Sequence, residues 1–493
     1  MNDILLGIIS FVPFILIGFG ILKTNIKMHW VTLGVMFITS ALSFLWQRNV
    51  EVLIVSFAEG IIISLIPIIW VIFAAVFTYF ISIETGSIEK IKLFLNSISE
   101  DRNIQALIIA FCFGGFLESI AGFGTAVAIP TGMLVALGFN PVTAAIISLV
   151  ANSVPVAFGA LGLPIIVLSN LTQLSLHVIT KYVALQLLPF SMIVPFAIVI
   201  ISNGGFRNLK KSVLDTLIIG FTFTLTQTLV AFFVGPELVA VLGSLVSLMV
   251  IVFIKNLNKP NPYLNQIFLP FVNYFILLIF VVLTRFVLVD PLSKYPFVFY
   301  VHVFHKSIKI DYLTTPGTLL FISSIIGAYL QGANTKKILN TASLTISKIK
   351  WSALTIISIV ILAKVMGNTG MIISSAILIA NISSIMYPVF APIIGAIGTF
   401  ITGSDTSSNI LFGVLQKETA NNLNLNVSWI TASNTSGATA GKMISPQSIA
   451  VASSAVGLQG YERQIISVTL PICLVYSIIL GLYIWLIILL KIV

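Results

Sequence analysis

Residues Ala151 to Pro164 read ANSVPVAFGALGLP, and residues Ser433 to Pro446 read SNTSGATAGKMISP. The two segments align without a gap, and each is set inside hydrophobic sequence. Matches continue upstream at nearly the same offset, where Thr85-Gly86 corresponds to Thr369-Gly370. The identities within the two quoted segments are Asn152 with Asn434, Gly159 with Gly441, and Pro164 with Pro446. The chain therefore carries an internal repeat, with polar, helix-breaking sequence at the same place in each copy.

Composition places this repeat in a membrane. The 493 residues are 58% hydrophobic and 8% charged, with a mean hydropathy of +1.11. This leaves too little polar surface for a soluble protein. A span needs about 20 mostly apolar residues, so we expect roughly a dozen crossings. The start, MNDILLGIIS, has no basic run before its apolar stretch and reads as a first span rather than a signal peptide.

The net charge of +10 reflects basic residues at the ends of spans, which are topology signals rather than a nucleic-acid surface. They predict a cytoplasmic side and place the N-terminus outside. The loop after Thr85-Gly86 is basic, whereas the loop after Thr369-Gly370 has no Lys or Arg until Lys417. The two repeats are therefore expected to be inverted. The residues that mark the cytoplasmic side are Lys23, Lys27, Lys90, Lys92, Arg102, Arg207, Lys210, Lys211, Lys255, Lys259, Lys336, Lys337, Lys348 and Lys350.

The predicted fold is an all-α polytopic membrane protein with two inverted repeats, broken helices and re-entrant hairpins. The segment from Asp290 to Asp311 is expected to be a solvated external loop. Cys112 and Cys473 are far apart in apolar sequence and predict neither a disulfide nor a metal site, and no cofactor is expected. The expected divisions are N-terminal spans at 1–65, repeat 1 at 66–202 with a transport core at 104–202, linking scaffold spans at 203–350, and repeat 2 at 351–493 with a core at 388–486.

Charged residues inside spans are costly and need a partner or a purpose. Glu118 lies in GGFLESIAGFGTAVAIPTG, whose glycines predict a helix, a break and a second helix. Its carboxyl could accept a proton for coupling, or it could cap the neighbouring half-helix. Asp405 lies in TGSDTSSN, which lipid could not tolerate unless protein or a cavity enclosed it. It could cap the following helix, or contact the substrate or a proton.

The matched segments after Asn152 and Asn434 have the pattern of discontinuous helices. A half-helix N-terminus carries unpaired N–H groups and partial positive charge, so two of them facing each other would bind an anion such as a carboxylate. Lys442 replaces Ala160 of the first copy and adds a full positive charge. Lys442 could contact the substrate, or it could form a structural bridge with Asp405.

Together, GFLESIAGFG, NSVPVAFGALGLP, TGSDTSSN and SNTSGATAGKMISPQSIA resemble the bacterial L-lactate permease family over nearly the whole chain. The resemblance implies a proton-coupled symporter for L-lactate and related 2-hydroxymonocarboxylates such as glycolate, in the bacterial cytoplasmic membrane. It also implies an elevator-type carrier, in which a moving core slides against scaffold spans that could form a homodimer contact. It places Glu118 and Asp405 in proton coupling. The substrate residues that it implies are Asn152, Ser153, Asn434, Thr435, Ser436 and Lys442 for the carboxylate, and Thr402, Ser404 and Asn409 for the hydroxyl group.

Two other classes remain open from the sequence. A sodium-coupled carboxylate carrier would use the carbonyl groups freed at broken helices to ligate Na⁺. An ion channel would line a pore with the polar interruptions, although the sequence has no repeated filter. An enzyme is not expected, because the spans contain no His-containing metal motif and no Ser-His pair.

Overall fold

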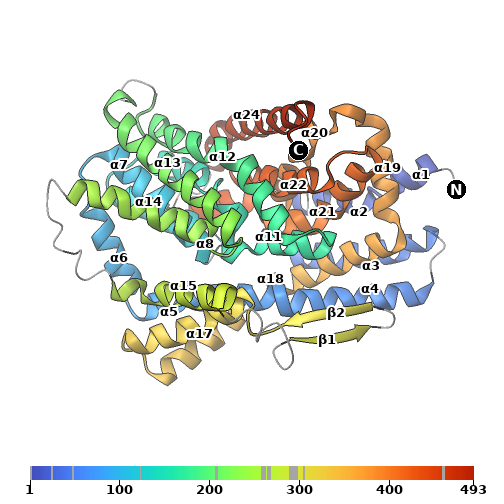
Figure 1. Ribbon diagram of the computed structural model, residues 1–493, viewed down its shortest axis with the longest axis horizontal. Helices are drawn as coiled ribbons and strands as arrows, with labels where there is room; N and C mark the ends of the chain where they lie inside the picture. Colours follow the sequence, from blue (N-terminus) through green and yellow to red (C-terminus); the bar gives the residue numbers. More distant parts are fainter. Residues whose placement is uncertain are drawn as a thin grey trace.

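The computed structural model describes residues 3–493 apart from 24–25, 47–48, 121, 123, 206–208, 257–262, 264–267, 288–297, 304–305 and 458–460. It is almost entirely helical, which confirms the all-α prediction (Figure 1). Within this described part, nine helices are long and apolar enough to cross a membrane, and shorter apolar helices accompany them. The chain is a multi-pass membrane protein.

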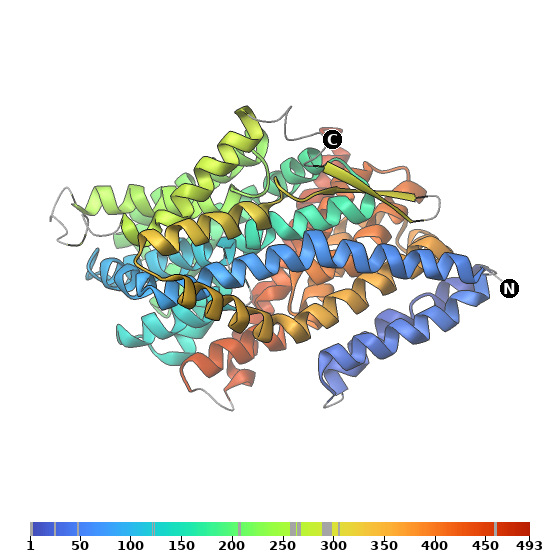
Figure 2. The same ribbon diagram turned by 90° about the horizontal axis from the view of Figure 1, so that it is seen from below.

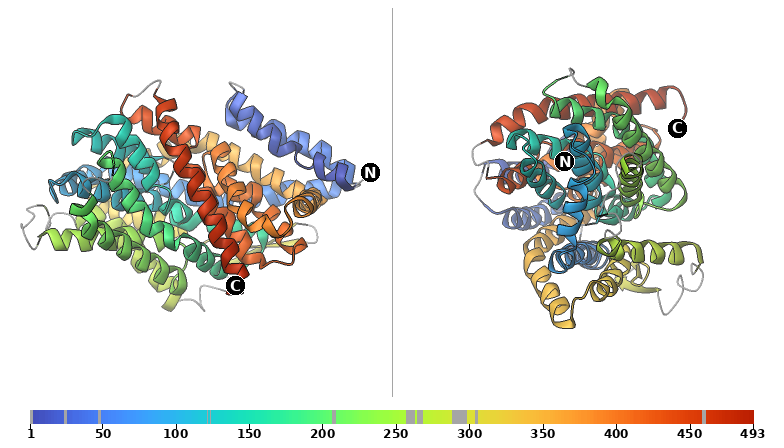
Figure 3. Two further views of the ribbon diagram at one scale, coloured as in Figure 1. Left: turned by 90° about the horizontal axis from the view of Figure 1, so that it is seen from above. Right: turned by 90° about the vertical axis from the view of Figure 1, so that its left-hand side faces the viewer.

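The helices form two layers, seen one above the other in Figure 1 and end-on in the right view of Figure 3. We call the lower one the platform layer; it contains α3 (Met28–Leu42), α4 (Val50–Ile63), α5 (Trp70–Glu84), α15 (Val272–Val282), α17 (Pro316–Leu330) and α18 (Thr335–Thr369). The core layer contains α7 (Arg102–Ala106), α8 (Gly114–Ile120), α9 (Thr125–Ala136), α10 (Pro141–Ala151), α11 (Gly159–Thr172), α12 (Leu176–Ser202), α13 (Leu209–Phe233), α14 (Val239–Asn256), α20 (Tyr387–Thr402), α21 (Asp405–Asn422), α22 (Val427–Lys442), α23 (Pro446–Ala455) and α24 (Glu462–Leu489).

Four helices lie at the margins of these layers: α1 (Asp3–Ile9), α2 (Val12–Lys23), α6 (Ser87–Asn96) and α19 (Met371–Ser383). One cluster of buried apolar side chains runs through the core layer, and a second joins the platform to α11 and α21. The two layers are therefore in contact through the same helices that carry the polar, broken segments.

Two long helices organise the platform layer. A π-helical segment at Ser64–Ile69 joins α4 to α5, so they run end to end across the molecule (Figure 2). With 35 residues, α18 is roughly 50 Å long, well beyond the ~30 Å of a bilayer core. Glu59 on α4 lies 3.9 Å from Nζ of Lys364 on α18 and accepts a hydrogen bond of 3.0 Å from Asn368. These two intramembrane charges therefore have each other as partners.

The two halves of the chain have the same order of helices. In each half a glycine with left-handed backbone, Gly86 or Gly370, precedes the first helix of the series. The helices that follow correspond one to one in chain order: α6 to α19, α7–α8 to α20, α9 to α21, α10 to α22, α11 to α23, and α12 to α24. This order agrees with the internal repeat that the sequence indicates.

The helix, break and second helix predicted around Glu118 are present. Helix α8 ends at Ile120 and α9 begins at Thr125, while α20 ends at Thr402 and α21 begins at Asp405. Both turns use glycines at positive φ, namely Gly122 and Gly124 in the first and Gly403 in the second. A glycine lacks the Cβ atom that makes this conformation costly, so the chain can reverse within a few residues.

The breaks in the matched segments differ from the prediction in the second half. Helix α10 does end at Ala151, but α22 continues through Asn434 to Lys442, and the break lies at residues 443–445. Some of the small polar residues of α22 satisfy their hydroxyl groups within the helix, so their presence does not require a break. Ser433 donates to the carbonyl of Ile430, and Thr439 donates to that of Ser436.

In the first half the break carries strained backbone. Ala160 and Leu161 have φ of 43° and 57°, and Gly162 has φ of 75°. Left-handed backbone costs about 1–2 kcal/mol at a non-glycine residue. At Gly162 a Cβ atom would also meet the backbone of Pro236 at 2.7 Å, so only glycine fits there.

The expected external loop contains a β-hairpin. Strands β1 (Val298–Val303) and β2 (Lys306–Asp311) pair antiparallel, with Val298 opposite Asp311 and Val303 opposite Lys306. The prediction of a plain loop is therefore wrong for these residues, because β1 is rich in the β-branched and aromatic residues that favour strands. Residues 288–297 lie outside the described part of the chain.

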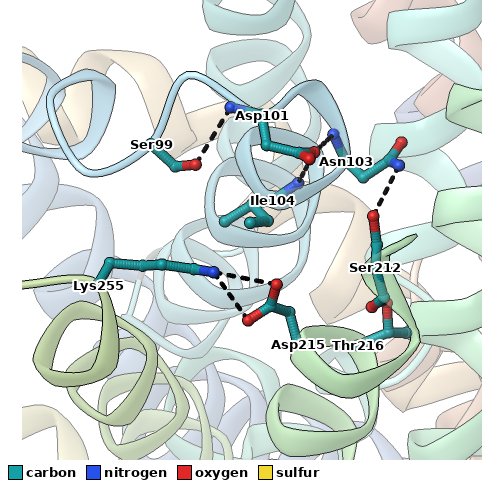
Figure 4. Close-up of polar contacts among 8 residues, drawn as sticks. All are labelled: Ser99, Asp101, Asn103, Ile104, Ser212, Asp215, Thr216 and Lys255. Carbon is teal, nitrogen blue, oxygen red and sulfur yellow. Dashed lines mark hydrogen bonds and ion pairs between the residues drawn. The ribbon is translucent and has the colours of Figure 1, made fainter. Parts of the chain in front are cut away.

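Helices α13 and α14 are fixed to the start of the core layer by polar contacts (Figure 4). Asp101 caps α7 by accepting from the backbone N–H groups of Asn103 and Ile104. The Asn103 amide donates to Ser212 Oγ at 2.9 Å, and Nζ of Lys255 on α14 lies 2.9 Å from Oδ1 of Asp215 on α13. The same two helices pack on α12 and α8.

Close contact between α20 and α22 generates a stability prediction. A Cβ on Gly437 would collide with the carbonyl of Pro392, and one on Gly441 with that of Ala396. We expect Gly437→Val to destabilise the fold by about 1–3 kcal/mol, because overpacking forces the helices apart. The measurement is the thermal unfolding midpoint of the purified protein in detergent. The control is Gly367→Val on α18, where a Cβ meets nothing within 4 Å; equal loss in both variants would contradict the packing argument.

Candidate functional site

A cavity of about 420 Å³ lies between the two layers. The platform layer contributes Met28 and His29 from α3, Ile72 from α5, and Trp351, Ser352, Thr355 and Ile356 from α18. The core layer contributes the broken segments: Glu118, Gly122, Gly124, Val156, Gly159, Ala160, Leu163, Pro164, residues 401–407, Lys442, Pro446, Gln447, Ser448 and Val451. The cavity therefore lies where helices of both halves are interrupted.

Four helices begin at this cavity. The turn before α9, the first residues of α11, the first turn of α21 and the first turn of α23 all line it. The sequence predicted two such N-termini, and the structure brings together four. Each carries unpaired N–H groups and about half a positive charge, so the arrangement favours a bound anion.

Glu118 lies on α8 and is 4% exposed. Its Oε2 atom is buried without a hydrogen-bond partner, and its Oε1 atom faces Gly159 so closely that a Cβ there would lie 2.9 Å away. Among the described residues, no side chain caps α9 or α11. The carboxyl group therefore faces the cavity and does not act as the helix cap, which was one of the two alternatives left open by the sequence.

Asp405 is the first residue of α21 and is 2% exposed. The residue that caps α21 is Ser404, whose side chain accepts from the N–H of Ser407 at 3.3 Å. Of the two alternatives that the sequence left open for Asp405, the helix cap is therefore wrong, because the extended backbone of Ser404 places the serine hydroxyl, one residue earlier, over the free N–H groups. Both carboxylate oxygens of Asp405 are buried without a hydrogen-bond partner.

Lys442 is the last residue of α22, and its ammonium group donates to the carbonyl of Gly403 at 2.8 Å. It lines the same cavity as the carboxyl groups of Glu118 and Asp405. The ion pairs seen in the described part of the chain do not include one between Lys442 and Asp405. In this conformation the lysine is therefore not held in the bridge that the sequence left open.

Several predicted substrate residues form a buried network away from the cavity lining. The amide of Asn409 donates to the Pro164 carbonyl at 3.0 Å and to Thr435 Oγ1 at 2.7 Å. Asn434 donates to Asn409 Oδ1, and Ser436 donates to Gln186 on α12 at 2.8 Å. The network ties α11, α12, α21 and α22 together, and none of these side chains lines the cavity.

The remaining predicted residues divide between the cavity and its surroundings. Thr402 and Ser404 line it. Ser153 does not, and its hydroxyl donates to the carbonyl of Val150 at 2.7 Å. Asn152 is 1% exposed, and its amide lies beside the Glu118 carboxyl without forming an aligned hydrogen bond.

Sequence reasoning missed His29 and Trp351 in the platform layer, and Gln447 and Ser448 at the start of α23. Gln447 and Ser448 could have been found in the segment GKMISPQSIA, because its serine and proline mark the start of a helix. His29 and Trp351 gave no such signal, since each sits at the end of an apolar run beside basic residues and reads as an interfacial residue.

Comparison with known proteins agrees with this architecture. The family model described as L-lactate permease matches residues 7–491. The L-lactate permease of Streptococcus iniae is 39% identical over 76% of this chain and 82% of its own length. The glycolate permease GlcA of Escherichia coli (strain K12) is 32% identical over 96% of this chain and 94% of its own length. The L-lactate permease of Bacillus subtilis (strain 168) is 33% identical over 95% and 93%, respectively. The chain belongs to the L-lactate permease family.

Proposed function

We propose that this chain is a secondary active transporter that carries L-lactate and related small 2-hydroxymonocarboxylates, including glycolate, across the bacterial cytoplasmic membrane together with a proton. The observation that carries the proposal is the cavity at which four helix N-termini and Lys442 meet the carboxyl groups of Glu118 and Asp405, whose Oε2, Oδ1 and Oδ2 atoms are buried without a hydrogen-bond partner. Relatives named for lactate and for glycolate support this substrate class.

The charges of the site explain why a proton would travel with the anion. With Lys442 charged and both Glu118 and Asp405 ionised, the empty site carries one net negative charge. A bound 2-hydroxycarboxylate would add a second, which a low-dielectric site strongly disfavours. One proton on either carboxyl restores the charge of the empty site. Binding of substrate and binding of the proton would therefore favour each other.

The substrate's two polar groups have separate partners in the proposed complex. The carboxylate would meet Lys442 and the N–H of Gln447, which is the first N–H of α23 because Pro446 has none. The hydroxyl group would meet Thr402 and Ser404, which line the cavity beside Asp405. Asn152 would orient the Glu118 carboxyl, because an amide can donate to its ionised form and accept from its protonated form.

We further propose that the two halves are inverted repeats and that the core layer moves against the platform as an elevator. The cavity's position between the layers supports this division. From the sequence α13 and α14 are expected in the scaffold, but their contacts with α12 and α8 favour their moving with the core. Trp351 at the cavity is 48% exposed and follows Lys348 and Lys350. If basic residues mark the cytoplasmic side, the N-terminus is outside and this conformation opens inward.

The first test is uptake of labelled L-lactate into proteoliposomes. We expect an inward proton gradient to drive accumulation above equilibrium and external glycolate to inhibit it, because both acids present the same carboxylate and hydroxyl groups. A sodium gradient at equal pH is the control. Accumulation driven by sodium alone would assign the chain to sodium-coupled carriers, and equilibration without accumulation would favour a channel.

Replacement of Lys442 by methionine tests the carboxylate contact. We expect Lys442→Met to weaken L-lactate binding at least tenfold, since a hydrogen bond to a charged group contributes about 1.5–3 kcal/mol. Binding is measured by calorimetry on the purified protein, with Lys417→Met, on α21 outside the cavity lining, as control. Unchanged affinity with a lower unfolding temperature would instead assign Lys442 to its bond with the Gly403 carbonyl.

Replacement of Glu118 by glutamine separates exchange from coupling. A neutral amide mimics the protonated acid, so Glu118→Gln should still exchange internal for external lactate but should lose accumulation driven by a proton gradient. Exchange and net uptake are measured under a series of imposed pH gradients. Asp405→Asn is the matched variant. If net uptake in Glu118→Gln still follows pH like the unmodified protein, Glu118 is not the coupling residue.

A further inference from the structure

The cavity offers two kinds of surface. Its charged groups all come from the core layer: Glu118, Asp405 and Lys442. The platform layer contributes Met28, Ile72 and Ile356 together with the rings of His29 and Trp351. Trp351, Ser352, Thr355 and Ile356 follow helical spacing, so one face of α18 forms this wall. The Thr355 hydroxyl is already used, since it donates to the Trp351 carbonyl at 3.0 Å.

The Trp351 ring is held in place although it is half exposed. The His29 ring stacks on it, with centroids 4.5 Å apart and planes 17° apart, and His29 itself is only 7% exposed. Nζ of Lys350 lies 5.4 Å from the centroid of the same indole. Stacking and the cation–π contact fix the indole as a preformed apolar surface.

The cavity is large for a three-carbon acid. Its 420 Å³ corresponds to roughly 14 water molecules at ~30 Å³ each. The volume also falls within the ~300–1,000 Å³ that is usual for sites of drug-sized ligands. In the proposed complex the carboxylate and hydroxyl groups of the substrate bind at the core layer. The substituent at C2, which is only a hydrogen in glycolate and a methyl group in lactate, is then too small to fill the rest of the cavity.

We propose that the site accepts 2-hydroxy acids with longer apolar substituents at C2, and that Trp351, held by His29, is the specificity-determining wall that the substituent contacts. The inference rests on the proposed function, because that function sets the polar end of the substrate at the core layer. An apolar chain reaching the platform would displace water from Met28, Ile356 and the indole. Each buried methylene should therefore tighten binding by up to about fourfold.

The first measurement is inhibition of labelled L-lactate exchange in proteoliposomes by glycolate, lactate, 2-hydroxybutyrate and 2-hydroxyhexanoate. We expect the inhibition constant to fall along the series, by about two- to fourfold per methylene. Leakage from protein-free liposomes with each acid controls for membrane damage. A rise of tenfold or more beyond lactate overturns the inference. Exchange of lactate itself reports on the proposed function, so a carrier that exchanges lactate but rejects longer acids fails only the present proposal.

Variants of Trp351 test the wall itself. In Trp351→Ala the ratio of the glycolate constant to the 2-hydroxyhexanoate constant should fall toward one, whereas Trp351→Phe should keep most of it because a ring remains. Trp30→Ala is the control: Trp30 is 53% exposed and also contacts His29, at 5.3 Å between centroids, but does not line the cavity. Equal weakening of glycolate and 2-hydroxyhexanoate by Trp351→Ala would overturn the role, since it would show a general effect on the carrier.

Discussion

Backbone groups freed by a broken helix cannot be left facing lipid, and this constraint governs the whole structure. An unsatisfied N–H or C=O in hydrocarbon costs several kcal/mol, so a chain that interrupts several membrane helices must surround each interruption with protein. The core layer does this with side chains as well as helices. At the break between α20 and α21 the Lys442 ammonium donates to the carbonyl of Gly403, and the Ser404 hydroxyl accepts from the N–H of Ser407. The glycines Gly437 and Gly441 let α22, which ends at Lys442, lie close against α20.

The interruptions that impose this requirement also create the site. Breaking a helix places its N-terminal dipole inside the protein, and the cavity collects four such ends. Positive potential from the backbone and from Lys442 then lets two acidic side chains remain buried at one place. The buried polar residues of the core layer therefore divide into those that face the cavity and those that hold helices together. Glu118, Asp405 and Lys442 face the cavity, whereas Asn409, Asn434 and Thr435 bond to one another and hold the broken helices together.

This division explains what could be predicted from sequence. The order of helices in the two halves, the glycine turns after α8 and α20, and the burial of Glu118 and Asp405 all depend on local composition, and the structure has each of them. The placement of Asn434 and Thr435 does not follow from composition, because amide and hydroxyl groups serve equally well to bind a solute or to satisfy a neighbouring helix. For the same reason the polar residues from Asn434 onward led to the prediction of a broken helix there, whereas α22 remains helical to Lys442. His29 and Trp351 meet across more than three hundred residues of chain, and no pattern in either segment indicates that contact.

The two halves differ in charge at one pair of matched positions that line the cavity. At matched positions the first half has Ala160, in strained left-handed backbone beside Glu118, and the second has Lys442 at the end of a regular helix. A strictly symmetric site would hold either two lysines or none. Two lysines would cancel the charge of two ionised carboxyl groups, and none would leave the acidic pair without a counter-charge. One lysine against two ionised carboxyl groups leaves one carboxyl that, in the proposed mechanism, takes up a proton when the anionic substrate binds. The proposed coupling of an anion to a proton therefore depends on this difference between the two halves.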